Sequence, residues 1–144
     1  MAKNPRSSKA KGRRLQNFVR DLLREIYRDL HPDDIKSQTM GMTGEDIVLS
    51  PAARDLCSFS FECKNVERLQ MWQAIDQCEG NKPEGTDPAI VFKKNGKQPY
   101  IAIPFQVFCD MLQFENEGRV NEQKEPTSKG ISPTIRPERV RNGQ

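Results

Sequence analysis

The clearest pattern in the sequence is a helical repeat of apolar side chains near the N-terminus. Between residues 15 and 30 these positions recur every three or four residues, the spacing that gathers side chains on one face of an α-helix. Pro32 follows, and proline is typical just beyond a helix end. The pattern predicts an amphipathic helix of about four turns. Its apolar members are Leu15, Phe18, Val19, Leu22, Leu23, Ile26, Tyr27 and Leu30.

The middle of the chain has the pattern of strands. Residues 35–42, 46–49 and 58–65 predict three strands that pair as a meander, with Gly44-Glu45-Asp46 at a turn and residues 50–57 as a connection. In the third strand, SFSFECKN, alternate side chains differ in kind. The apolar Phe59, Phe61 and Cys63 share one face, and the polar Ser60, Glu62 and Lys64 share the other.

The second half of the chain predicts a helix, a hairpin and another helix. Residues 66–79 carry Leu69, Trp72 and Ile75 at helical spacing, and we expect these three in the core. Residues 89–92 and 100–103 flank Asn95-Gly96, a dipeptide typical of a β-hairpin turn. A short helix is expected over 104–114. The fold class predicted is α/β, a central mixed β-sheet flanked by helices, in the order αβββαββα.

Charge is distributed unevenly along the 144 residues, whose net charge is +3. Residues 1–14 contain six basic side chains and no acid, whereas residues 15–114 are net acidic. We therefore expect a basic flexible arm over 1–14, a folded domain over 15–114 and a disordered polar tail over 115–144. A basic arm is often only a solvated tail, but it is also typical of a segment that neutralises phosphates.

Several classes of protein are disfavoured by composition. No apolar run is long enough to span a bilayer, and the N-terminus lacks the apolar core of a signal peptide, so we expect a cytoplasmic protein that makes no membrane contact. The four cysteines form no Cys-x-x-Cys pair, and His31 is the single histidine. A zinc site is thus unexpected, and the thiols suit a reducing compartment.

Two carboxylates can meet at the polar face of the third strand. Asp46 begins the preceding strand, and the residues between it and Glu62 allow a strand, a turn and a return strand. Paired carboxylates repel each other unless a cation lies between them, and hard oxygen ligands suit Mg²⁺ or Mn²⁺. Lys64, on the same face as Glu62, adds a positive charge that can stabilise a pentacovalent phosphate. This set is consistent with phosphodiester hydrolysis.

Simpler structural roles are open to the same residues. Glu62 and Lys64 could form a surface ion pair of little consequence. The acid-x-Lys pattern also occurs at Asp34 with Lys36 and at Glu122 with Lys124, so the tripeptide alone is weak evidence. His31 is expected to be a helix-end residue, because Pro32 follows it.

The stretches KGRRLQNFVRDLL, GEDIVLS and FSFECKN together resemble the PD-(D/E)xK nuclease superfamily, most closely its Holliday junction resolvase branch and small phage-encoded endonucleases. The resemblance covers roughly residues 11–110 and neither terminus. Asp46, Glu62 and Lys64 match the family motif. The family usually has a glutamate on the first helix where this chain has Gln16, so the resemblance leaves either Gln16 or Glu25 to act through a water.

The resemblance also implies further roles. The backbone carbonyl of Cys63 is expected to join Asp46 and Glu62 as a metal ligand, and Gln77 matches a glutamine that related nucleases direct towards the site. The cofactor implied is Mg²⁺ (or Mn²⁺), with no small-molecule cofactor. The partners implied are branched DNA and a second copy in a homodimer. The expected DNA contacts are Lys11, Arg13, Arg14, Lys93, Lys94 and Lys97.

The sequence therefore predicts a magnesium-dependent DNA endonuclease, structure-selective for branched DNA. Two alternatives stay open. The same chemistry serves exonucleases and nicking enzymes of this superfamily. Alternatively, the change to Gln16 signals lost catalysis, and the chain is a DNA-binding scaffold for recombination whose basic arm binds DNA.

Overall fold

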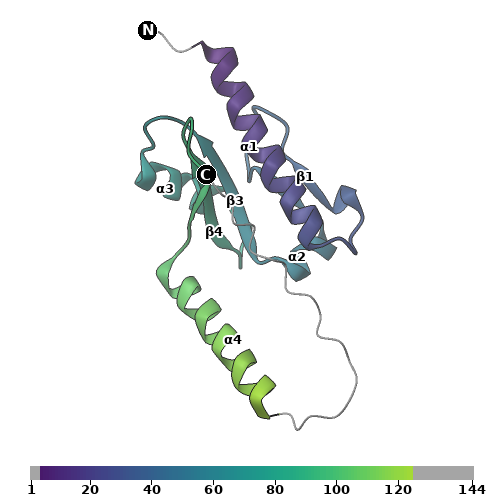
Figure 1. Cartoon of the computed structure of the whole chain (residues 1–144). Helices are drawn as coiled ribbons and strands as arrows, with labels where there is room; N and C mark the ends of the chain where they lie inside the picture. The colour runs from purple at the N-terminus through teal and green to yellow at the C-terminus, as the bar shows by residue number, and fades with distance from the viewer. Residues whose placement is uncertain (1–3, 125–144) are drawn as a thin grey trace. The chain divides into compact units, whose positions relative to one another are not determined.

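A computed structural model of the protein describes residues 4–124 and has an α/β fold (Figure 1). The chain divides after Cys109 into two compact units, and all the strands lie in the first. Its elements in chain order are α1 (Pro5–Ile26), the 3₁₀ turn η1 (Pro32–Asp34), β1 (Ile35–Ser37), β2 (Ile47–Leu49), α2 (Pro51–Leu56), β3 (Phe59–Asn65), α3 (Met71–Asn81), β4 (Asp87–Lys93), β5 (Tyr100–Ala102) and α4 (Phe105–Lys124).

The strands form two hydrogen-bonded sheets in place of the single sheet that the sequence predicts. β3 pairs in parallel with β4, and β4 pairs antiparallel with β5, while β1 and β2 form a separate antiparallel pair. The expected meander is thus broken between β2 and β3. The cause is α2, a helix in the segment that the sequence predicts as a connection: Ser50 accepts a hydrogen bond from Ala53 N–H and Pro51 occupies the first turn.

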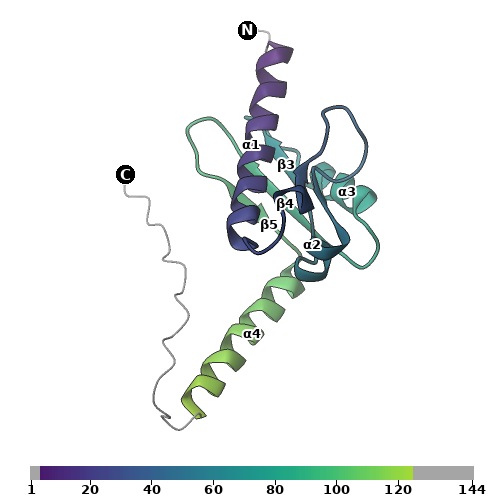
Figure 2. The ribbon, with the colours of Figure 1, turned by 90° about the vertical axis from the view of Figure 1, so that its right-hand side faces the viewer.

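Helices cover both faces of the β3–β4–β5 sheet (Figure 1, Figure 2). The larger core cluster joins Leu15, Val19 and Leu23 of α1 to Phe61 and Cys63 of β3. A smaller cluster on the other face joins Ala74 and Cys78 of α3 to Ile90 of β4. The polar face of β3, which carries Glu62 and Lys64, is therefore the face towards α3.

Both long helices extend beyond their predicted bounds. α1 begins at Pro5, so residues 5–14 are helical where a flexible arm was expected. Asn4 accepts a hydrogen bond from the backbone N–H of Arg6, and this cap with Pro5 starts the helix before any apolar periodicity exists. α1 also ends at Ile26, before the predicted Leu30.

At the other end of the chain, α4 continues to Lys124, so residues 115–124 are helical where the sequence predicts disorder. Glu115 and Arg119 form an ion pair at the i, i+4 spacing that supports a helix without an apolar face. The remainder of the predicted tail, residues 125–144, lies outside the described part. The third helix also differs, because α3 begins at Met71 and not at residue 66. Trp72, predicted in the core, is 78% exposed.

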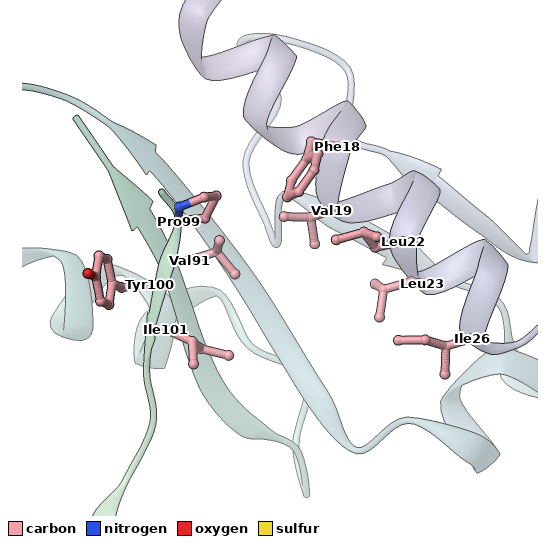
Figure 3. Close-up of a pocket in the computed structure, with 9 residues that line it drawn as sticks. All are labelled: Phe18, Val19, Leu22, Leu23, Ile26, Val91, Pro99, Tyr100 and Ile101. Carbon is pink, nitrogen blue, oxygen red and sulfur yellow. The ribbon is translucent and has the colours of Figure 1, made fainter. Parts of the chain in front are cut away.

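An apolar groove of about 400 Å³ separates α1 from β5 (Figure 3). Phe18, Leu22 and Ile26 line it from α1, and Tyr100 and Ile101 line it from β5. All five side chains are between 42% and 67% exposed, and no charged residue lines the groove. No helix within residues 4–124 has both the length and the apolarity to cross a membrane.

Substituting Ile47 tests whether β2 is anchored in the core as described. Ile47 is 0% exposed, whereas its neighbour Val48 is 38% exposed. Ile47→Ala is expected to lower the free energy of unfolding by about 2–5 kcal/mol, because it leaves a cavity. Val48→Ala is the matched control and should lower the free energy of unfolding by well under half as much. Urea denaturation measures both, and equal losses would contradict the placement of β2.

Candidate functional site

The candidate site lies at the edge of β3 that β4 leaves free. There the backbone N–H of Asp46 donates to the carbonyl oxygen of Phe61 at 2.9 Å. The Asp46 carboxylate accepts a hydrogen bond from the N–H of Cys63, with 2.7 Å between Oδ2 and N. Because the N–H and C=O of one strand residue point to the same edge, the Cys63 carbonyl lies on the Asp46 side of the strand.

Glu62 and Lys64 form an ion pair next to this edge. Glu62 is 2% exposed, and its Oε1 lies 2.8 Å from the ammonium nitrogen of Lys64. Lys64 also donates to Oε1 of Gln77 on α3 at 2.8 Å. One ammonium therefore joins the polar face of β3 to α3, and the Gln77 side chain fixes its direction.

Gln16, and not Glu25, is the α1 residue beside the carboxylates. Gln16 is 8% exposed, its side chain hydrogen-bonds Asp46, and its Oε1 has no hydrogen-bond partner. Glu25 is exposed. At 100° per residue the two positions lie about 180° apart around the helix, so they face opposite directions.

Both carboxyl groups have pKa values above their ordinary ones. Burial raises the pKa of Asp46 above its ordinary value, although the hydrogen bond from Cys63, the charge of Lys64 and the hydrogen bond from Gln16 lower it. Burial also raises the pKa of Glu62; the Lys64 ammonium opposes this rise, and the nearby Asp46 charge adds to it. The positive charge and hydrogen bonds near each carboxylate therefore do not fully offset the cost of burying its ionised form.

These features fit a hard divalent cation. The available donors are two carboxylates, the Cys63 carbonyl and the buried, unpartnered oxygen of Gln16, and oxygen ligands of this kind suit Mg²⁺ and Mn²⁺. A cation between the carboxylates would offset the cost of burying their charges and the repulsion that Asp46 exerts on Glu62. Within residues 4–124 no group of three or more His, Cys, Asp or Glu side chains has a metal-binding arrangement, so this set depends on its amide and carbonyl oxygens.

The predicted DNA contacts lie outside the carboxylate cluster. Arg13 and Arg14 are exposed on α1, and Lys11 is half-buried, its backbone carbonyl accepting a hydrogen bond from Asn65. The other three, Lys93, Lys94 and Lys97, line a groove of about 390 Å³ beside the β4–β5 hairpin.

A second polar cluster lies beside Asp46, and the sequence pattern does not predict it. Glu45 accepts hydrogen bonds from Arg54 at 2.5 Å and from Ser60 at 2.9 Å, and Arg54 also donates to the carbonyl of Phe59 at 2.9 Å. Glu45 lay in a predicted turn and Arg54 in a predicted connection, so only the polar Ser60 on β3 signalled the contact. The cluster ties α2 to the start of β2 and so supports Asp46.

The acid-x-Lys match at Asp34 and Lys36 has a local structural role. Asp34 accepts a hydrogen bond from the N–H of His31, which is the N-cap of η1 and not, as expected, a residue at the end of the first helix. Lys36 lies 3.7 Å from Asp33 in an exposed pair. Asp34 and Lys36 therefore do not form a second site of the Glu62 and Lys64 kind.

Comparisons with protein-family models, curated proteins and solved structures found no match.

The raised pKa of Asp46 makes a prediction about stability. A carboxyl whose pKa is raised by folding destabilises the folded protein while ionised, so this penalty is full above the raised pKa and disappears as pH falls through it towards 3.8. Asp46→Asn is therefore expected to be more stable than wild type at pH 7.5 without metal, and the difference should shrink on acidification.

Adding Mg²⁺ at 100 times its dissociation constant should stabilise wild type by about 2.7 kcal/mol and leave Asp46→Asn unaffected. Thermal unfolding between pH 4.5 and 8 measures both effects. Asp76→Asn, at an exposed position of α3, is the control and should behave like wild type. A variant Asp46→Asn that Mg²⁺ still stabilises would contradict the assignment.

Proposed function

We propose that the protein is a divalent-metal-dependent DNA endonuclease of the PD-(D/E)xK type. The observation that carries the proposal is the half-buried Asp46 with the buried Glu62, both with raised pKa values, beside a Lys64 ammonium held between Glu62 and Gln77. Metal-dependent hydrolysis of a phosphodiester uses carboxylates that hold the cation and a positive charge near the phosphate. The same four side chains supply both.

We also propose that the first compact unit is a restriction-endonuclease-like core. The order helix, two strands, strand, helix, two strands supports this, with α2 as an addition between β2 and β3. In such a core the acidic residues stand where β2 approaches the edge of β3, the position of Asp46 and Glu62.

Each side chain has a distinct part in the proposed reaction. Attack of a water on phosphorus breaks one ester P–O bond and leaves a phosphate monoester and a hydroxyl. Lys64 orients the water and stabilises the charge that develops on the phosphate oxygens. Gln77 is a positioning residue that holds Lys64, and Gln16 holds a water through its free oxygen. Bound Mg²⁺ or Mn²⁺, on Asp46, Glu62 and the Cys63 carbonyl, would supply Lewis-acid catalysis.

The substrate that we propose is DNA, bound mainly through its phosphates. Arg13 on α1 and the hairpin lysines Lys93, Lys94 and Lys97 are the proposed main contacts, and Lys11 and Arg14, on another flank of α1, are proposed as weaker, peripheral contacts. None of the described elements has the features of a helix that reads the major groove, so recognition by shape is favoured over recognition by base sequence. A branched substrate fits that mode.

We propose a homodimer, because cutting two strands requires two active sites. Its contact is the apolar groove between α1 and β5 (Figure 3). Because no charged residue lines the groove, it has no cation that could bind a DNA phosphate. We therefore propose an apolar protein surface as its occupant. β5 ends the sheet, and an edge strand presents backbone groups that a second strand can pair. In a dimer with two-fold symmetry, the same surface of each copy forms the contact. The apolar face of α1 and β5 in one copy would then pack against the same face of the other copy.

The nuclease proposal is tested by cleavage of duplex, flap, nicked and four-way DNA with and without Mg²⁺. Wild type should cut in Mg²⁺ and not in chelator. Asp46→Asn, Glu62→Gln and Lys64→Ala should each lower the cleavage rate about 10²-fold or more while binding DNA.

Lys36→Ala removes the lysine of the second acid-x-Lys match and should cut like wild type. Metal-independent DNA binding with no cleavage of any substrate would favour the scaffold alternative. A wild-type rate in any of the three site variants would show that the site is assigned wrongly.

The dimer is tested at Ile101, which is 54% exposed in the groove. Ile101→Glu places a charge in the apolar contact and should convert the dimer into a monomer that nicks one strand without cutting both. Val48→Glu changes an exposed β-branched residue of another strand and should stay dimeric. Analytical ultracentrifugation measures the masses, and a monomeric wild type at high micromolar concentration would refute the contact.

A further inference from the structure

The basic segment at the N-terminus is a continuous part of the helix that reaches the candidate site. α1 runs unbroken from Pro5 to Ile26, and its first turns project beyond the sheet (Figure 1, Figure 2). Residues 4–10 are exposed, whereas Gln16 is 8% exposed and hydrogen-bonded to Asp46. The cations therefore lie at the start of a continuous helix that passes beside the carboxylates at Gln16.

The cations divide into two flanks of this helix. Arg6, Lys9 and Arg13 are spaced by three and four residues, and Gln16 follows three residues after Arg13. At 100° per residue these four positions fall within about 80° of one another, in line along the helix. Lys11 and Arg14 lie on another flank, and Lys11 lines a cleft with Asn65 and Asn95 at the far end of β3 and the hairpin. We call Arg6, Lys9 and Arg13 the basic stripe.

The basic stripe is unfavourable for the free protein. Like charges three or four residues apart on a helix repel each other, and cations in the first turns oppose the helix dipole. Residues 4–14 contain no acid that could offset either effect. A bound polyanion removes both penalties. Arg13 and Arg6 are seven residues, or about 10.5 Å, apart along the helix axis, a length of about three nucleotide steps at 3.4 Å of rise along a duplex axis.

We propose that the basic stripe binds the phosphates of one DNA strand and, through the continuous helix, sets which phosphodiester of that strand reaches Asp46, Glu62 and Lys64. This inference rests on the proposed nuclease function. It assigns α1 two tasks: Arg6, Lys9 and Arg13 hold the strand, and Gln16, about 4.5 Å further along the axis from Arg13, reaches the site. The segment is then a positioning element and not a flexible tether.

A matched pair of double variants tests the stripe. Lys9→Gln with Arg13→Gln, and Lys11→Gln with Arg14→Gln, each remove one lysine and one arginine from the same two turns of one helix. DNA affinity is measured in chelator over a range of salt concentrations. The stripe variant should flatten the slope of log affinity against log salt by about 1.8 units, and the matched variant by less than about 0.9 units. Equal slopes would overturn the assignment of the stripe.

Two further variants test the rigidity of the helix without changing its charge. Ala10→Pro removes the N–H that bonds the carbonyl of Arg6 and breaks the helix between Lys9 and Arg13. On an end-labelled substrate it should spread the cuts over neighbouring phosphodiesters and lower the rate at the main position at least about threefold at saturating protein. Gly12→Ala has no atom within 4 Å of the added Cβ and favours the helix, so it should keep the wild-type cut position. A wild-type cleavage pattern in Ala10→Pro would overturn the positioning role.

These readouts separate the inference from the function on which it rests. If wild type never cuts but the two double variants differ in salt slope, the stripe binds DNA, the nuclease proposal fails and the positioning role fails with it. If wild type cuts and the double variants do not differ, the nuclease proposal stands and the stripe is refuted. Circular dichroism and thermal unfolding confirm that each variant keeps the core.

Discussion

The edge of β3 at Phe61 and Cys63 is the constraint on which the site depends. A strand edge presents backbone groups that need partners, and here Asp46 provides two: its N–H to the carbonyl of Phe61 and its carboxylate to the N–H of Cys63. The carboxylate is thereby held in a half-buried position near the buried Glu62. Two acids in such a place are costly, and the Lys64 ammonium, held by Gln77, offsets only part of that cost. The remaining deficit of positive charge is what makes the site a candidate for a cation.

The surrounding structure is arranged to hold this edge. The ion pair of Glu45 and Arg54 fastens α2 to the start of β2, and Ile47 anchors β2 in the core directly after Asp46. From the other side α1 packs Leu15 and Val19 against β3 and so delivers Gln16 to the carboxylates. Arg54 of α2 thus holds Glu45 next to Asp46 in the chain, and Gln16 of α1 hydrogen-bonds Asp46 itself.

Much of the site was accessible from the sequence because it depends on local patterns. The alternation in SFSFECKN separates Glu62 and Lys64 from Phe61 and Cys63, and the spacing to Asp46 allows a return strand. The β4–β5 hairpin follows in the same way from Asn95-Gly96. The choice between Gln16 and Glu25 required the rotation of α1 about its axis, which only packing against β3 decides.

The errors have physical causes as well. Apolar periodicity detects only the buried part of a helix. It therefore missed the turns of α1 before Leu15, where the helix begins with a cap at Asn4 and with Pro5. It also missed the turns of α4 beyond Phe114. It also placed Trp72 inside, although Ala74 and Cys78 are the residues of α3 that are buried. The split between the two sheets depends on α2, a helix of six residues that is too short to show a period.

The most direct test of the central claim is a crystal structure of the protein soaked with Mn²⁺, with the ion located by its anomalous scattering. The account predicts a peak about 2.0–2.3 Å from a carboxylate oxygen of Asp46, from one of Glu62 and from the Cys63 carbonyl. It also predicts that Lys64 stays bonded to Gln77 and that the peak is lost in Asp46→Asn. Carboxylates that bind no ion at saturating Mn²⁺, with the only peaks elsewhere on the surface, would contradict it.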